Sequence, residues 1–331
     1  MKKIIILILV SIFIFSSCSR KKPEIKAETF ALDTVIDIVL YNSTDEVSNE
    51  IINYISELEK KYSFYADNKI SQANSSDEIV EIDEGLRDII KASLEVSKNT
   101  EGSFDITIGS ISKLWDFHPN SPKIADDQKI EENLKYVDYK NIELTNLGLR
   151  LKGNSQIDLG GIAKGYICDE LVKLARDRKV ESAIFNLGGN TYTLGLKGDR
   201  PFKIGIRDPF MSQSDIFAVL DSSDEAVVTS GVYQRYIKTQ DSTYHHILDP
   251  KTGYPAESEL VSVTVIGKSS MIADAYATGL LVLGKDRAIE KAKELNLEVI
   301  LVDKDSNTYV SDSLKDRLKI TNERFKLKYI K

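Results

Sequence analysis

The residues most suited to chemistry lie between positions 156 and 169, where an acid, paired glycines and a lysine precede a helical pattern. Asp158 is followed by Gly160 and Gly161, and then by Lys164. Glycines let backbone N–H groups approach an anion, and a helix N-terminus adds partial positive charge. The stretch therefore predicts a phosphate-handling turn, although it matches neither common glycine-rich nucleotide motif. The alternative is an ordinary strand-to-helix turn whose glycines serve geometry alone.

A second chemical candidate is the segment 243–255, where two histidines precede a series of rigid turns. His245 and His246 are followed by an Asp-Pro step, by Lys-Thr-Gly and by a further proline. Such turns restrict the backbone, so a histidine directly before them would be held in a fixed orientation. The alternative is a hairpin connection whose histidines are merely solvated.

A third candidate is the pair Asp274 and Thr278, which stand at i and i+4 on one face of an otherwise apolar helical pattern. Two oxygen ligands one turn apart could hold a cation. Three histidines in the whole chain and no Cys-x-x-Cys argue against zinc, so a hard cation such as Mg²⁺ is favoured. The alternative is that both side chains cap the helix.

The bulk composition restricts the class of protein and its partners. The 331 residues are 42% hydrophobic and 29% charged, which is typical of a globular chain. The formal net charge of −7 argues against nucleic acid as a partner and suits a protein that recruits a divalent cation before it meets a phosphate.

The N-terminus reads as an export signal. Lysines precede an apolar run over residues 4–15, which is shorter than the roughly 20 residues that span a bilayer. Small residues directly before Cys18 resemble a bacterial lipobox, so we expect residues 1–17 to be removed, Cys18 to carry lipid and residues 18–27 to form a tether. Simple cleavage without lipid is the alternative. Cys168 lies in a helical pattern and is expected to be a small buried hydrophobe.

Apolar periodicity predicts alternating strands and helices without a linker, so we expect one composite α+β unit over residues 28–331. Residues 28–41 read as one half-buried strand, Ser43 with Glu46 as the capping box of the next helix, and residues 61–74 as an aromatic loop. The main further helices are expected at residues 86–101, 128–137, 164–177, 271–283 and 285–295. The main further strands are expected at residues 79–82, 149–151, 183–186, 202–206, 216–220, 226–229, 261–266, 298–302 and 308–310.

Eight short motifs, taken in order, resemble one known family. They are Ala31-Leu32-Asp33-Thr34, Ser63-Phe64-Tyr65 with Lys69-Ile70-Ser71, Gly102-Ser103-Phe104-Asp105-Ile106-Thr107, Asp158-Leu159-Gly160-Gly161-Ile162-Ala163-Lys164-Gly165, Asn186-Leu187-Gly188-Gly189-Asn190, Thr229-Ser230-Gly231, His246-Ile247-Leu248-Asp249-Pro250 with Thr252-Gly253, and Ala273-Asp274-Ala275 with Ala277-Thr278. The chain resembles the ApbE-type FAD:protein FMN transferases, which are flavin-handling lipoproteins of bacterial envelopes.

The resemblance implies a mixed and antiparallel sheet flanked by helices, with FAD in a central cleft and one or two Mg²⁺ ions on its pyrophosphate. The metal would be held by Asp274, Thr278 and the backbone carbonyl of Gly161. The residues expected to contact FAD are Leu32, Tyr65, Ser103, Phe104, Asp105, Asp158, Lys164 and Leu248. The implied reaction moves FMN to a threonine or serine hydroxyl of an exported flavoprotein and releases AMP. A metal-dependent FAD pyrophosphatase and a non-catalytic FAD-binding lipoprotein remain alternatives.

The implied reaction needs a base for the target hydroxyl, and His246 is our candidate because an unperturbed imidazole titrates near neutrality. His245 is its rival, and Asp274 is expected to be essential through the metal. One departure from the family pattern is Leu32-Asp33, where methionine-glycine is usual. The resemblance also implies an extracytoplasmic protein, anchored to a membrane by lipid.

Overall fold

The computed structural model describes residues 24–118, 121–212, 214–240 and 242–331. The expected signal peptide, Cys18 and the first part of the expected tether lie outside these residues. None of the helices within the described ranges is long and apolar enough to cross a membrane.

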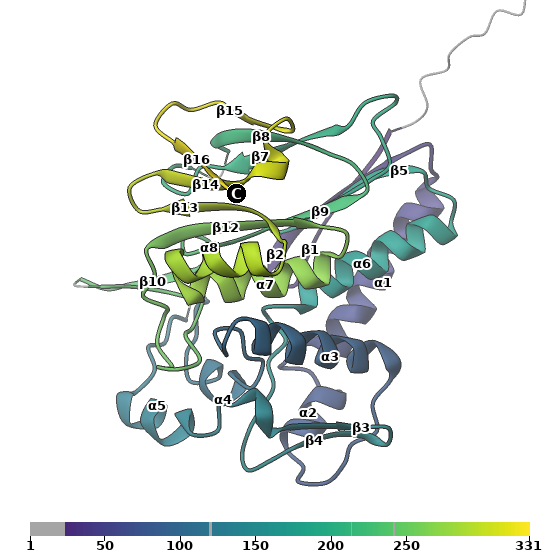
Figure 1. The fold of residues 1–331 in the computed structure, drawn as a ribbon. Coiled ribbons are helices and arrows are strands. Elements are labelled where there is room, and N and C mark those ends of the chain that lie inside the picture. The colour runs from purple at the N-terminus through teal and green to yellow at the C-terminus, as the bar shows by residue number, and fades with distance from the viewer. Residues whose placement is uncertain (1–23, 119–120, 213, 241) are drawn as a thin grey trace, which may run out of the picture.

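A nine-stranded sheet forms the centre of the molecule (Figure 1). Its neighbouring strands are antiparallel, except for the parallel pair at the C-terminal edge. The strands, in spatial order, are β1 (Glu24–Ala31), β2 (Thr34–Tyr41), β5 (Ser182–Leu187), β6 (Asn190–Leu194), β9 (Glu225–Gly231), β12 (Leu260–Gly267), β13 (Glu298–Asp303), β14 (Asn307–Ser311) and β16 (Lys326–Ile330).

The expectation of one strand over residues 28–41 is wrong, because the chain reverses at Leu32 and Asp33. Both residues have left-handed backbone angles, with φ of 55° and 57°. The Leu32 N–H donates to the Glu59 carboxylate over 2.6 Å, which holds the turn against the following helix. The apolar alternation continues across the turn, so periodicity could not reveal it. β1 also begins at Glu24, inside the segment expected to be tether.

Among the described residues, four helices pack on one face of this sheet, and α3 (Glu84–Asn99) packs on the outer side of α7 (Ser270–Leu283) (Figure 1). The four are α1 (Asp45–Tyr62), α6 (Ala163–Asp177), α7 and α8 (Lys285–Glu294). Asp83 is the N-cap of α3, since its carboxylate accepts the Leu86 N–H. The expected capping box at Ser43 is wrong, because Thr44 caps α1.

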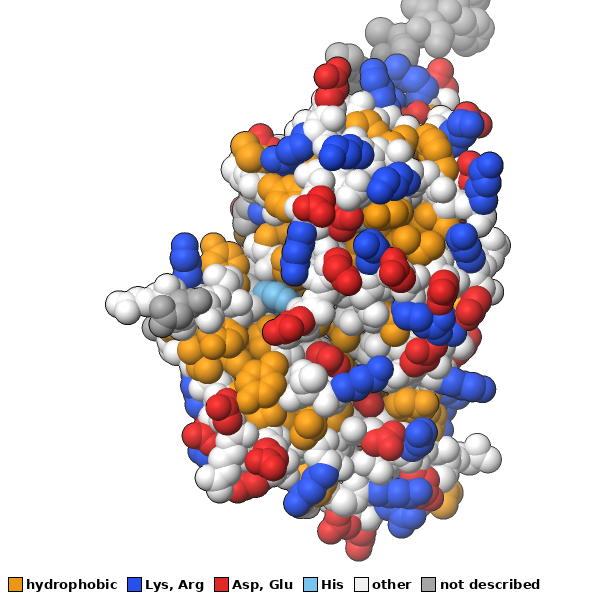
Figure 2. Space-filling view, turned by 60° about the vertical axis from the view of Figure 1, so that its left-hand side comes forward, with side chains coloured by type: hydrophobic (Ala, Val, Ile, Leu, Met, Phe, Trp, Pro, Cys, Tyr) orange, Lys and Arg blue, Asp and Glu red, His pale blue; other side chains and the backbone are white. Residues whose placement is uncertain are grey.

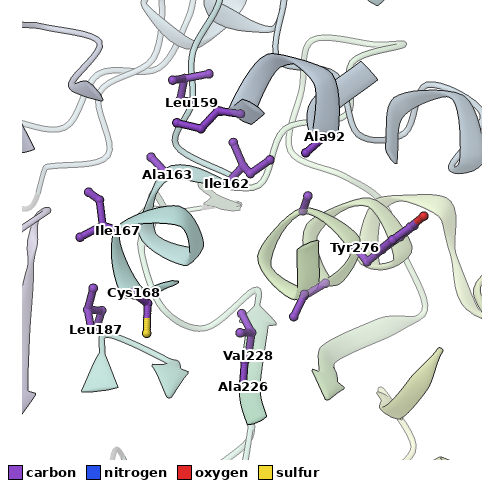
Figure 3. Close-up of a cluster of buried hydrophobic side chains, with 14 of the residues drawn as sticks. Ala92, Leu159, Ile162, Ala163, Ile167, Cys168, Leu187, Ala226, Val228 and Tyr276 are labelled. Carbon is purple, nitrogen blue, oxygen red and sulfur yellow. The ribbon is translucent and has the colours of Figure 1, made fainter. Parts of the chain in front are cut away.

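The core between this helical layer and the sheet is dry and apolar. Figure 3 shows Ile167 and Cys168 of α6 above Leu187 of β5, with Ala226 and Val228 of β9 beside them. Cys168 is fully buried, as expected for a small hydrophobe. The opposite face of the sheet packs on a smaller sheet of β7 (Phe202–Arg207), β8 (Ile216–Ser222) and β15 (Leu318–Ile320).

The remaining elements lie at the edge of the helical layer. They are α2 (Lys69–Asn74), α4 (Gly109–Ser112), α5 (Asp127–Leu134), the hairpin β3 (Ile142–Thr145) with β4 (Gly148–Leu151), and the ribbon β10 (Tyr236–Lys238) with β11 (Thr243–His245). The expected loop 61–74 is therefore partly wrong, because Asn68 caps α2 through a complete capping box. The expected strand 79–82 is reduced to a single bridge from Val80 to Leu149.

Candidate functional site

The first wall of the candidate site is the junction between the N-terminal ends of α6 and α7. Asp274 of α7 is 3% exposed, and its Oδ2 accepts the Gly165 N–H of α6 over 2.9 Å. A Cβ on Gly165 would lie 2.3 Å from the Ser270 carbonyl oxygen, so only glycine permits this approach. Asp169 of α6 in turn accepts the backbone N–H groups of Ser270 and Met271. The two helix ends are thereby held together.

The structure brings the three expected metal ligands together at this junction. A Cβ on Gly161 would lie 3.7 Å from Thr278 Oγ1 and 3.1 Å from the Phe104 ring, so Gly161 faces Thr278 across a short gap. Thr278 lies one helical turn after Asp274, and its hydroxyl is 3.2 Å from the Ser230 hydroxyl of β9. Residues from three distant segments thus meet where sequence spacing alone could not place them.

The electrostatics of Asp274 fit a bound cation. Burial raises the pKa of Asp274, and the Lys164 charge, the Gly165 N–H and the Asn190 side chain oppose that shift. The Asn190 amide nitrogen is itself buried, and the Asp274 carboxylate is the charged group on which it acts. A buried carboxylate is costly unless its charge is compensated, which a divalent cation would do.

The donor set at the junction suits Mg²⁺ better than a softer metal. Within the described residues no group of three or more His, Cys, Asp or Glu side chains could hold a metal ion. The available ligands are one carboxylate, one hydroxyl and a backbone carbonyl, and Mg²⁺ typically uses one or two carboxylates with water and substrate phosphate. Asp274, Thr278 and Gly161 therefore fit the ion that the resemblance implies.

Asp158 and Lys164 shape the glycine turn beside this junction. Asp158 Oδ1 accepts the Gly160 N–H over 2.9 Å, and Oδ2 accepts the Ser112 hydroxyl over 2.7 Å. The Lys164 ammonium lies 3.4 Å from the Gly160 carbonyl and stays partly exposed. Lys164 therefore keeps a positive charge close to Asp274, where an anionic ligand could meet it.

Ser103, Phe104 and Asp105 are buried behind the turn. Asp105 Oδ1 accepts the N–H and hydroxyl of Thr107, and Oδ2 accepts the Tyr139 N–H. These bonds give Asp105 a structural task in holding its loop. Contact of this segment with a dinucleotide stays a prediction.

The second wall of the site carries His246, at the root of the β10–β11 ribbon. Figure 2 shows the ribbon projecting from the body, with a histidine ring at its base and hydrophobic side chains gathered below it. His246 Nδ1 lies 3.1 Å from the Arg235 carbonyl. The surrounding protein and the charges of Arg235 and Lys164 lower the pKa of His246 to about 3, although the side chain keeps part of its surface open to solvent. A pKa this far below that of an unperturbed imidazole leaves His246 uncharged at neutral pH.

His245 points elsewhere and is a poor rival as a base. Its Nε2 lies 3.0 Å from the Ala256 carbonyl, and its Nδ1 is buried without a hydrogen-bond partner among the described residues. A substrate hydroxyl could reach neither nitrogen without displacing protein.

The rim of the site is aromatic. Tyr65 is 82% exposed, and its pKa is raised by the surrounding protein and by the carboxylates of Asp158, Asp116 and Asp33. These carboxylates come from separate segments, so Tyr65 stands where the segments converge. A large exposed ring at such a point offers a stacking surface.

Comparison with known proteins decides the family. Residues 32–301 match the sequence model of the ApbE family. This chain belongs to the ApbE family. A FAD:protein FMN transferase from Treponema pallidum is 31% identical over 276 residues, which cover 78% of this chain and 75% of that protein. One from Vibrio cholerae is 27% identical over 323 residues, covering 93% and 96%.

Solved ApbE structures show the same fold. The ApbE protein from Thermotoga maritima has a TM-score of 0.82 at 31% identity, covering 89% of this chain and 99% of that chain. The flavin transferase ApbE from Vibrio cholerae has a TM-score of 0.79 at 26% identity, with the same coverage. The expected α+β fold is confirmed, and the protein is an enzyme of the transferase class.

Two expected flavin contacts of this ApbE-family chain, Leu32 and Leu248, pack on different apolar clusters. Leu32 is half-buried at the β1–β2 turn and packs on the main core. Leu248 packs on a separate apolar cluster that contains Ile111 and Trp115. Two surface pockets of about 390 and 350 Å³ lie elsewhere, beside Arg176 and beside Asn154 respectively, and none of the expected FAD or metal residues lines either one.

Sequence reasoning missed Asp169 and Arg235. Asp169 caps a helix that begins about a hundred residues later, which no local signal shows. Arg235 follows the Thr229-Ser230-Gly231 motif, and a basic residue close to a family motif was the one available signal.

Proposed function

We propose that the protein transfers FMN from FAD to a threonine or serine hydroxyl of an exported flavoprotein, with Mg²⁺ bound, and releases AMP. The observation that carries this proposal is the convergence of Asp274, Thr278 and Gly161 beside Lys164, with an uncharged His246 on the facing wall. The family membership and the names of the relatives support flavin transfer.

The chain's own residues account for binding and orientation. The positive charges of Lys164 and Arg235 both act on His246, so the two side chains lie near the same part of the site. We propose that the pyrophosphate binds between them. Tyr65 would cover the flavin ring, and Leu32 and Leu248 would line its pocket. When bound to Asp274, Thr278 and the Gly161 carbonyl, Mg²⁺ would neutralise charge on the pyrophosphate oxygens.

The reaction requires one bond to form and one to break. The oxygen of the target hydroxyl attacks the phosphorus of the FMN half of FAD, and the bond from that phosphorus to the bridging oxygen breaks. AMP leaves with the electron pair, and the hydroxyl proton passes to His246 Nε2. The phosphate charge beside Arg235 and Lys164 offsets the two cations that lower the pKa of His246, so the base is stronger when substrate is bound.

The test is incubation of the purified protein with FAD, Mg²⁺ and an exported acceptor domain, followed by mass spectrometry of the acceptor. The expected product is an acceptor that carries FMN, together with AMP. Free FMN with an unmodified acceptor would instead establish the pyrophosphatase, in which water replaces the hydroxyl. Unchanged FAD would favour a non-catalytic FAD-binding lipoprotein.

We also propose that Cys18 carries lipid and holds the enzyme on the extracytoplasmic side of a bacterial membrane, where exported acceptors lie. The proposal rests on the lipobox-like residues before Cys18 and on the basic tether after it. Labelling with a lipid precursor should mark the full chain, and Cys18→Ser should abolish the label and release the protein from membranes.

A further inference from the structure

Asp33 occupies a turn position that disfavours most side chains. Its φ of 57° lies in the left-handed region, where glycine is at ease and Asp and Asn are better tolerated than other residues. A side chain at such a place invites a search for the contact that it makes.

The Asp33 carboxylate contacts the wall that carries His246. Asp33 Oδ2 lies 3.4 Å from Arg235 Nη1, and the two side chains are 74% and 45% exposed. Asp33 belongs to the turn between β1 and β2, whereas Arg235 directly precedes β10. The pair therefore ties an edge of the nine-stranded sheet to the root of the separate β10–β11 ribbon.

The backbone of Arg235 holds the imidazole of His246. The Arg235 carbonyl accepts the His246 backbone N–H over 3.1 Å and lies 3.1 Å from Nδ1. A carbonyl oxygen can only accept, so Nδ1 carries the proton and Nε2 keeps its lone pair. The other groups that act on the ring are the Arg235 guanidinium, the Lys164 and His245 side chains and the Phe117 ring.

We propose that Asp33 is a positioning residue for flavin transfer: its ion pair with Arg235 fixes the carbonyl that keeps His246 in the Nδ1–H tautomer, with Nε2 directed at the target hydroxyl. This inference rests on the proposed function, since it gives His246 the task of base. A glycine at position 33 would leave Arg235 without this counter-ion.

Two substitutions distinguish the effect of the Asp33 carboxylate from the effect of the turn conformation. Asp33→Asn and Asp33→Gly both retain a residue that tolerates the left-handed angle, and both remove the charge. Because the pair is exposed, each should lower kcat only about twofold to fivefold, with an unchanged KM for FAD. High salt should lower the kcat of the original protein toward the kcat of the two variants, since salt screens exposed charges.

The direct readout is the nitrogen-15 spectrum of the histidine rings, which is simple because the chain has three histidines. His246→Gln assigns the signal. We expect a protonated Nδ1 in the original protein and a smaller share of that tautomer in both Asp33 variants. Asp221→Asn, which breaks the exposed pair with Lys203 on the small sheet, is the matched control and should leave the signal unchanged.

The outcomes distinguish this inference from the proposed function. An unchanged tautomer share and an unchanged kcat in both Asp33 variants would overturn the positioning role of Asp33. A loss of kcat in only one of the two variants would also overturn it, because it would come from the changed backbone of the turn and not from the lost charge. Full transferase activity in His246→Gln would remove the base role and the positioning role together, while the spectrum would still report the contact from Asp33 through Arg235. A lowered tautomer share with a lowered kcat in both variants, absent in Asp221→Asn, supports it.

Discussion

The two walls of the candidate site differ in how their key side chains are held. On the first wall Asp274 is 3% exposed and accepts a backbone N–H from a neighbouring helix. On the second wall His246 lies at the root of a ribbon, beside the Asp33–Arg235 ion pair, whose side chains are 74% and 45% exposed. The first wall is part of the main core, where packing permits few alternatives. The second wall is joined to the body by the packing of Ile237 and Tyr244 against Trp115, and also by the Asp33–Arg235 ion pair, which salt can weaken. We therefore expect the proposed metal and phosphate side to hold its charges in fixed positions, and the proposed acceptor side to adjust more easily.

The largest expected effect is at the buried wall. Asp274→Ala should lower flavin transfer by about 10²- to 10³-fold, as the loss of a preorganised electrostatic group does in other enzymes. Mg²⁺ at a hundredfold excess over its Kd should raise the free energy of unfolding of the original protein by about 2.7 kcal/mol. The thermal midpoint of the original protein should rise accordingly, and that of the variant should not change. An equal Mg²⁺ shift in both proteins would place the ion elsewhere.

The next effect is at the exposed wall. His246→Gln should lower kcat about 100-fold, because it removes the proton acceptor, whereas His245→Gln should cost much less because its Nε2 is committed to the Ala256 carbonyl. Steady-state kinetics of both variants measure the difference. Equal losses would show that the ribbon as a whole matters more than one imidazole.

A smaller effect should follow from forcing the two helices apart. Gly165→Ala places a methyl group 2.3 Å from the Ser270 carbonyl and should destabilise the protein by about 1–3 kcal/mol in urea unfolding. Gly267→Ala is the control, because a Cβ there meets nothing within 4 Å and its φ is ordinary. Similar midpoints for the two variants would contradict the tight junction.

Removal of the exposed Tyr65 ring should lower activity less than the substitutions at Asp274 and His246. Tyr65→Ala should raise the KM for FAD by about twofold to tenfold, the value of one aromatic contact, and Tyr65→Phe should be close to the original protein. Initial rates over a range of FAD concentrations give both values. A large effect of Tyr65→Phe would assign the function to the hydroxyl instead of the ring.

The two walls should also respond to pH in opposite directions. A raised pKa of Asp274 means that metal-free protein loses stability as pH rises above about 3.8, because the folded state holds the proton longer than the unfolded state. The lowered pKa of His246 means that stability is lost as pH falls from about 6.5 toward 3, because the unfolded state takes up the proton first. Asp274→Asn and His246→Gln should each flatten one of these trends in urea midpoints measured across pH.

Local signals in the sequence were enough for much of the helical layer. Asp83 caps α3 and the apolar stripe of that helix is buried, because capping and amphipathic spacing act within a few residues. The turn at Leu32 and Asp33 escaped prediction because Leu32 is not a usual turn former and the apolar alternation runs through the turn. Its conformation depends on Glu59, which lies in a later helix.

The site divides in the same way. Residue types and the order of motifs pointed to the family and to Asp274, Thr278, Gly161 and His246, since chemistry limits which side chains can hold a cation or move a proton. The sequence could not supply the charge state of His246, which follows from burial and from Arg235 and Lys164.

The sequence by itself determined the family, the residue types available for chemistry and most helical segments, because these depend on composition and short-range spacing. Only the tertiary structure decided that Gly165 lets Asp274 reach α6, that Gly161 faces Thr278, and that Asp33 reaches Arg235. The physical reason is that burial, distance and electric field are set by segments far apart in the chain, and they exist only once the chain has packed.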